Sequence, residues 1–295
     1  MAVVKSGVRI KVSKFRVRLS FGSILLNIFM ILLAAFTAIP LVYMISTAFK
    51  PLDELFIYPP RYFVRRPTLS NFTDLLISLG SSVVPFSRYI FNSLFTATVT
   101  VAGTVVVSGM GAYALSKHKL PGAGFIFSVI IAALMFSSHV TQIPSYIVVD
   151  KLGLLNSYWA LIIPKLAVAY NFFLMKQFLD QFPNELLEAS RIDGAKEHTI
   201  FWKIVMPSLR PAWSTLVVFS FVANWNDYFS PLVFISSQAM KTLPLALQTI
   251  GAAGNIARAG AMNAATLLMT LPTLIIFLVM QAMVMETMAH SGIKA

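Results

Sequence analysis

Long apolar runs separated by short charged segments extend along this chain of 295 residues. The runs cover residues 19–49, 89–116, 120–149, 152–175, 211–240 and 259–285. Each run is longer than the roughly 20 residues that an α-helix needs to cross a bilayer. The pattern therefore predicts an all-α polytopic membrane protein with six transmembrane helices, the first of them over residues 23–49.

Two segments between these runs are long enough to hold structure of their own. Residues 50–88 are rich in proline and are predicted to form an external loop. The run between Lys241 and Arg258 is too short, and too often interrupted by glycine and proline, to cross a membrane. It is predicted to be a second external loop with an interfacial helix.

Composition and charge support a membrane protein and predict its orientation. Hydrophobic residues make up 57% of the chain and charged residues 12%, against about 25% charged residues in soluble domains. The net charge is +12, but the basic residues lie at the ends of apolar runs, which is a topology signal and not a nucleic-acid surface. Residues 1–22 hold six of them and no acid. This distribution predicts cytoplasmic tails at 1–22 and 288–295, with 14 Lys and Arg inside and 8 outside.

A polar segment at residues 183–207 interrupts the apolar pattern. Pro183 and the acidic residues after it indicate a helix start, and Asp193-Gly194 indicates its end, because glycine adopts the left-handed conformation without strain. A second short helix is predicted from Lys196 to Val205, ended by Pro207. An ordinary pair of amphipathic surface helices would also fit these signals.

This segment resembles the EAA motif of permease subunits in bacterial ABC importers, most closely carbohydrate importers of the maltose-permease type. The matching residues are Glu188, Ala189, Asp193, Gly194, Ala195, Phe201, Ile204, Pro207 and Pro211. Ser190 and Met206 depart from the commonest form, which has alanine and leucine there. Both departures are conservative in size.

The resemblance implies a type I ABC importer transmembrane domain, with a core permease domain of five helices over residues 89–287. It implies that the polar segment is a coupling helix that docks into an ATPase subunit. The contacts would come from Glu188, Ala189, Ser190, Asp193, Gly194 and Ala195. It also implies a second permease, two ATPase subunits, an extracytoplasmic binding protein, a carbohydrate substrate and a bacterial plasma membrane.

Polar residues inside the predicted spans are candidates for the transport path. Asn224-Trp225-Asn226-Asp227 lies midway in the fifth span and resembles the Trp-Asn motif of sugar permeases. Lys165 interrupts the fourth span and is expected either to pair with Asp227, which is favoured, or to extend its ammonium to the membrane surface. Such residues are costly in hydrocarbon, so they should face the bundle interior or a water-filled path. They serve either as interhelical hydrogen-bonding partners or as part of the path.

The sequence holds no catalytic or cofactor motif. It has no Walker A pattern and no cysteine, and its four histidines are far apart without metal spacing. No enzyme activity, cofactor or metal is therefore predicted for this chain, and ATP hydrolysis would belong to partner subunits. The alternatives are an ABC importer of another solute, a secondary transporter and a membrane enzyme. The last two are disfavoured because neither inverted repeats nor clustered catalytic residues are visible.

Overall fold

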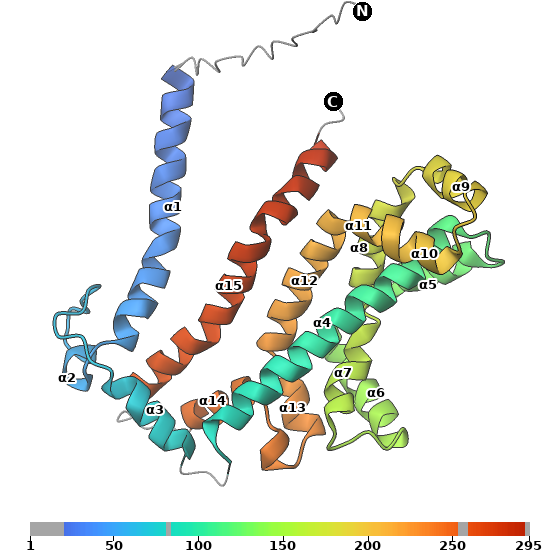
Figure 1. The fold of residues 1–295 in the computed structure, drawn as a ribbon. Coiled ribbons are helices and arrows are strands. Elements are labelled where there is room, and N and C mark those ends of the chain that lie inside the picture. Colours follow the sequence, from blue (N-terminus) through green and yellow to red (C-terminus); the bar gives the residue numbers. More distant parts are fainter. Residues whose placement is uncertain (1–20, 81–83, 253–258, 293–295) are drawn as a thin grey trace, which may run out of the picture.

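The computed structural model describes residues 21–80, 84–252 and 259–292, and these residues form helices without any strand (Figure 1). The elements are α1 (Phe21–Ala48), α2 (Leu52–Leu55), α3 (Ser70–Gly80), α4 (Phe86–Lys117), α5 (Ala123–Ala133), α6 (Ser138–Lys151), α7 (Tyr158–Leu166), α8 (Ala169–Asp180), α9 (Asn184–Ile192), α10 (Glu197–Ile200), the π-helix η1 (Phe201–Val205), α11 (Met206–Ser208), α12 (Arg210–Trp225), α13 (Phe229–Phe234), the 3-10 helix η2 (Gln238–Met240), α14 (Leu243–Ala252) and α15 (Ala259–Gly292). The expected basic tail lies mostly outside the described residues.

Three of the spans are single helices and three are bent. Among the described residues, α1, α4 and α15 are each long and apolar enough to cross a membrane alone. The other three are helix pairs by length and composition: α5 with α6 at 112°, α7 with α8 at 41°, and the α10–α11 segment with α12 at 77°, where α12 is the part that belongs to the predicted fifth span. Counting each pair as one span confirms the predicted six transmembrane helices, although the predicted runs did not reveal the bends.

The fifth span differs most from its prediction. The run over residues 211–240 was expected to be continuous, but α12 ends at Trp225 and a separate short helix follows. At the break, side chains form hydrogen bonds with backbone groups, in place of the regular backbone hydrogen bonds of an α-helix. Asn226 donates its side-chain amide to the Val222 carbonyl (2.9 Å), and Asp227 accepts the Ser230 N–H (3.1 Å). Asn and Asp often interrupt helices in this way.

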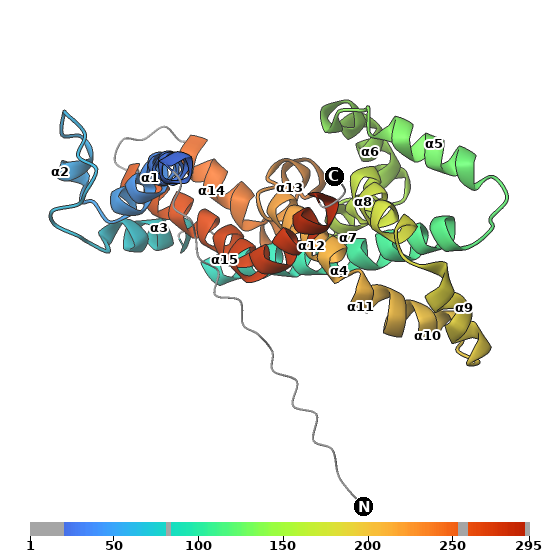
Figure 2. The same ribbon diagram turned by 90° about the horizontal axis from the view of Figure 1, so that it is seen from above.

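α4 is the central element of the fold (Figures 1 and 2). It packs against α7, α8 and α12 along its length. Its glycines allow close approach, because a Cβ at Gly103 would lie 2.5 Å from Leu166 and one at Gly111 would lie 2.9 Å from Phe172. Two buried apolar clusters flank it, one beside α14 and α15 and the other beside α8 to α11.

The N-terminal end of α4 is fixed by a polar contact. Asn92, which is fully buried, donates to the carbonyl oxygens of Ala239 (2.9 Å) and Lys241 (2.8 Å). The Tyr158 hydroxyl donates to the Asn92 side-chain oxygen (2.7 Å). These bonds join α4 to α7 and to the segment that precedes α14. That segment leads into the short helix predicted between Lys241 and Arg258, which is observed as α14.

α1 stands apart from the bundle (Figure 1). Its buried residues, Ser46 to Ala48, lie at its C-terminal end, where it meets α15. The remainder exposes apolar side chains, as expected for a helix in lipid or against a partner. The following loop is ordered, because Asn71 donates to the carbonyl oxygens of Ala48 (2.9 Å) and Lys50 (2.7 Å).

Candidate coupling loop and transport cavity

The polar segment folds into two helices joined by a glycine corner. α9 ends in a Schellman motif, in which the Gly194 N–H donates to the Arg191 carbonyl and the Ala195 N–H to the Ser190 carbonyl, both at 3.0 Å. Gly194 has a φ of +80°, a conformation that glycine adopts without strain. The predicted helix stop at Asp193-Gly194 is confirmed. The segment lies at the end of the molecule remote from α1 (Figure 2).

The second helix of the segment extends further than predicted. It was expected to run from Lys196 to Val205 and to be ended by Pro207. The chain instead stays helical from α10 through η1 and α11 to Ser208, and bends at Leu209 into α12. Pro207 lies in the first turn of α11, where its missing N–H costs little. The segment therefore continues directly into the fifth span.

α9 has one buried anchor and an exposed outer surface. Leu187 is 2% exposed and belongs to the apolar cluster beside α8. The motif residues Glu188, Ala189, Asp193 and Gly194 are exposed, and Ser190 and Ala195 are partly buried. Ile192 is 86% exposed beside them. A charged and apolar surface of this kind fits a protein partner.

The start of α9 is tied to the C-terminal end of α4. The Lys117 ammonium donates to the Phe182 carbonyl (2.6 Å) and to the Asn184 side-chain oxygen (2.9 Å). Sequence reasoning used Lys117 only as a topology charge. Its partners are 65 and 67 residues away, so no local pattern indicated the contact.

A cavity of about 740 Å³ with both polar and apolar walls lies between the bent spans. Its walls come from the α5–α6 break, α7, α8, the end of α12 and α13. The polar lining residues are Ser138, Thr141, Gln142, Ser145, Lys165, Tyr170, Asn171, Ser220, Asn224, Asp227 and Ser230. Hydroxyl, amide and charged groups within the spans suit a hydrated or hydroxyl-rich solute.

Lys165 and Asp227 meet on the cavity wall as an ion pair. This is the pairing expected from the sequence. Asp227 also accepts the Ser230 N–H, so each of its carboxylate oxygens has a partner. Asn224 lines the same cavity and donates to the Ser220 carbonyl (2.7 Å). The structure therefore brings three of the five candidate path residues together.

Trp225 and Asn226, the other two candidate path residues, do not line this cavity. Trp225 is 2% exposed, stacks on Phe221, and donates its indole N–H to the Met269 carbonyl of α15 (2.9 Å). Asn226 is exposed and does not line the cavity. The break after Trp225 separates the roles of the four residues. Trp225 packs α12 against α15, whereas Asn224 and Asp227 line the cavity.

Several lining residues were missed by sequence reasoning. Tyr170 and Asn171 follow Lys165 in the fourth span, and Asn171 donates to the Ser220 hydroxyl (3.2 Å). A stricter reading of polar side chains inside the apolar run 152–175 would have found both. Thr141 and Gln142 reach the cavity because of the α5–α6 bend, which was not predicted from the sequence.

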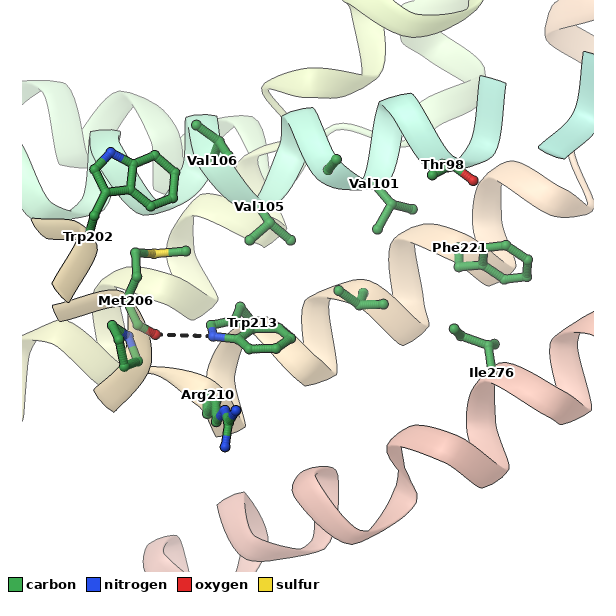
Figure 3. Close-up of a pocket in the computed structure, with 13 residues that line it drawn as sticks. Thr98, Val101, Val105, Val106, Trp202, Met206, Arg210, Trp213, Phe221 and Ile276 are labelled. Atoms are coloured by element: carbon green, nitrogen blue, oxygen red, sulfur yellow. Dashed lines mark hydrogen bonds between the residues drawn. The ribbon is translucent and has the colours of Figure 1, made fainter. Parts of the chain in front are cut away.

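A second, apolar cavity of about 680 Å³ lies on another side of α12, among α4, α11 and α15 (Figure 3). Val101, Val105, Phe221 and Ile276 line it, and the Trp213 indole N–H donates to the Met206 carbonyl at one end (3.1 Å). These walls offer hydrocarbon contact and little hydrogen bonding. The cavity therefore suits an apolar group and not a carbohydrate.

No group of three or more His, Asp or Glu lies together as a metal site in the described ranges. A family model described as binding-protein-dependent transport system inner membrane component matches residues 14–288.

Two curated proteins are similar over most of their length. The arabinooligosaccharides transport system permease protein AraQ of Halalkalibacterium halodurans is 29% identical over 280 residues, 92% of this chain and 96% of that protein. The sn-glycerol-3-phosphate transport system permease protein UgpE of Yersinia enterocolitica is 33% identical over 204 residues, 69% of this chain and 73% of that protein. A chain from a bacterial ABC transporter that imports the acidic polysaccharide alginate has the same fold, with a TM-score of 0.76 at 22% identity, covering 89% of this chain and 95% of that chain.

Proposed function

The chain belongs to the family of binding-protein-dependent transport system inner membrane components, and we propose that it is a permease subunit for ATP-driven import of a carbohydrate. As a member of this family it is a membrane protein and a permease component, and its relatives are not themselves the catalytic subunits. The carbohydrate assignment is supported by the name of the similar arabinooligosaccharide permease and by the hydroxyl- and amide-lined cavity.

The observation that carries the proposal is the exposed glycine corner that continues into the wall of the cavity between the bent spans. The coupling residues at the corner are Glu188, Ala189, Ser190, Asp193, Gly194 and Ala195. We assign to Glu188 an ion pair with a basic group of an ATPase subunit, and to Ala189 a close fit that a larger side chain would block. Movement of this segment would reach the cavity through the bend at Leu209 and α12.

The cavity residues Lys165, Asn224 and Asp227 form our proposed transport path. A sugar presents hydroxyl groups that need donors and acceptors, and amide and carboxylate side chains supply both. The ion pair neutralises the two charges, so a neutral solute would meet polarity without a net charge. Trp225 supports this wall from behind through its bond to Met269.

The proposal requires partners and an orientation. A second permease would complete the path, two ATPase subunits would hydrolyse ATP, and an extracytoplasmic binding protein would deliver the solute. The coupling corner and both tails would then face the cytoplasm, in agreement with the excess of basic residues on that side.

A reconstituted complex tests the function. The chain, expressed with its partner permease, ATPase and binding protein, should drive ATP-dependent uptake of an arabinooligosaccharide into vesicles. Glu188→Lys should abolish uptake while the chain remains inserted at its normal level. Uptake without ATP, or normal uptake by the Glu188→Lys complex, would contradict the proposal.

A different solute is the second candidate, because one relative is named for sn-glycerol-3-phosphate transport. The Lys165 ammonium would then bind the phosphate group, and its ion pair with Asp227 would have to open. ATP-dependent uptake of sn-glycerol 3-phosphate, with no uptake of the arabinooligosaccharide, would favour this candidate.

A further inference from the structure

Glu197 joins three parts of the chain at the coupling corner. The Tyr113 hydroxyl on α4 donates to one of its carboxylate oxygens (2.8 Å), and the Arg191 guanidinium on α9 donates to the other (2.7 Å). His118, directly after α4, lies 3.6 Å from the same carboxylate. One side chain at the start of α10 therefore holds the end of α9 and the C-terminal end of α4.

The carboxylate is favoured in its charged form. Hydrogen bonds from Arg191 and Tyr113 hold the pKa of Glu197 below its ordinary value, against a smaller opposing effect of burial. The Glu197 side chain is about half exposed, and exposed ion pairs contribute little to global stability. The contact therefore matters for geometry more than for stability. One carboxylate oxygen of Glu197 holds α4 and the other holds α9, which fixes the orientation of the two helices relative to α10.

Other contacts hold the start and middle of α9, through Lys117 and the buried Leu187, whereas Glu197 bonds the end of α9 beside Gly194. A Cβ built at Gly194 would meet open space, so no atom outside the adjoining residues lies within 4 Å of that position. Behind Glu197, the buried Tyr113 ring packs on Phe201 with ring centroids 5.6 Å apart. The apolar contact positions the Tyr113 hydroxyl, and Glu197 is its partner.

The same helix reaches the transport cavity. Thr104 on α4, which is fully buried, donates its hydroxyl to the backbone carbonyl of Lys165 (3.0 Å). Nine residues separate Thr104 from Tyr113, or about two and a half helical turns. α4 thus bonds to the coupling corner through Tyr113 and to the backbone of the cavity lysine through Thr104.

We propose that Glu197 is a positioning residue of energy coupling: it clamps α9 and α10 to α4, so that movement of the corner reaches Lys165 through α4 as well as through α12. This inference rests on the proposed function as an ATP-driven permease. Without the clamp, the corner would still meet the ATPase subunit but would turn about Gly194, and its movement would reach the cavity weakly.

The test follows cavity accessibility in the full complex, so that no solute is needed. A Ser138→Cys complex reports on the cavity, because Ser138 lines it and is exposed. Trapping the ATPase subunits with ADP and vanadate should change the maleimide labelling rate. Glu197→Gln and Tyr113→Phe should each reduce that change about two- to tenfold while vanadate-sensitive ATP hydrolysis continues.

Two controls separate a clamp from a general defect. Asp180→Asn breaks an ion pair within α8, Lys176–Asp180, and should leave the labelling change intact. The exchange Arg191→Glu with Glu197→Arg re-forms the pair in reverse and should restore at least part of the change. If Glu197→Gln does not insert, Tyr113→Phe decides, since it removes a single hydroxyl.

A cross-link separates the failure of this inference from that of the proposed function. Ile192→Cys should cross-link to a cysteine in the ATPase subunit. With this cross-link present, an undiminished labelling change in both Glu197→Gln and Tyr113→Phe overturns the clamp alone. If neither the cross-link nor any vanadate-dependent labelling change is found, the proposed function itself fails.

Discussion

Lys165 on α7 and Asp227 at the break after α12 form an ion pair on the cavity wall, 62 residues apart in the chain. Their side chains are 26% and 17% exposed, so the pair is partly shielded from water. Breaking one partner of such a pair leaves an uncompensated charge, whereas replacing both with apolar groups is often tolerated.

Lys165→Met should therefore destabilise the complex by about 1–3 kcal/mol, less than for a fully buried pair. The double change Lys165→Met with Asp227→Leu should recover most of that stability but not uptake. Thermal unfolding in detergent and uptake in vesicles measure the two effects. Equal stability of the single and double variants would show that the pair is not coupled.

Gly194 tests the corner. Gly194→Val should uncouple ATP hydrolysis from uptake, because a β-branched residue resists a φ of +80° and costs about 1–2 kcal/mol or more there. Gly194→Asn is the matched control, since asparagine tolerates this conformation and the added atoms meet open space. The ratio of uptake to ATP hydrolysis should be highest with glycine at position 194, lower with asparagine and lowest with valine. If both substitutions lower it equally, backbone strain is not the cause.

Substitutions at Trp225 and Asn224 should have different effects, the first on stability and the second on transport. Trp225→Phe keeps an aromatic ring but loses the bond to the Met269 carbonyl, so it should cost about 1 kcal/mol of stability with solute preference unchanged. Asn224→Ala should leave the melting temperature nearly unchanged and lower uptake. A changed solute preference in Trp225→Phe would indicate that the indole contacts the solute, and would contradict a purely structural role.

Single cysteines test the orientation. Lys196→Cys in the coupling segment should react with an impermeant maleimide only from the cytoplasm, and Gln238→Cys only from outside; both positions are exposed. The chain has no native cysteine, so labelling has no background. Labelling of Lys196→Cys in intact cells would reverse the topology and rule out contact with a cytoplasmic ATPase.

The Glu197 contact should have a defined pH dependence. The pKa of Glu197 is lowered in the folded protein, so the contact is fully present above the ordinary glutamate pKa and is lost as pH falls through the lower, folded value. Spin labels at Lys119 and Lys196 should give a narrow distance distribution from about pH 8 to pH 5 that broadens under more acid conditions. Glu197→Gln should give the broad distribution at every pH.

The sequence predicted those features that depend on local patterns. Run length alone gave the six spans, and Gly194 marked the corner because its backbone conformation is a property of one residue and its neighbours. The expected Lys165–Asp227 pair followed from the cost of isolated charges in hydrocarbon, which leaves few other partners.

Features that depend on tertiary packing were missed. The bend between α5 and α6 follows an apolar stretch without proline, and its local marker is Ser137, which caps α6 by accepting the His139 N–H. Trp225 was one of four consecutive candidate path residues, but the end of α12 turns it toward α15. The bond between Tyr113 and Glu197 crosses 84 residues, beyond any periodicity within one element.

α4 carries specific polar bonds at both of its ends: Tyr113 bonds to Glu197 and Lys117 to Phe182 at the coupling corner, and Asn92 bonds to Ala239 at the other end. If both ends belong to one energetic unit, coupling between the two faces of the membrane is reciprocal. A binding protein that raises the affinity of the ATPase subunits for nucleotide would then itself be held more tightly, by the same factor, in the nucleotide-bound complex. Replacing the Asn92 amide should therefore weaken the mutual enhancement of binding-protein affinity and nucleotide affinity by the same factor, because both report the same coupling free energy.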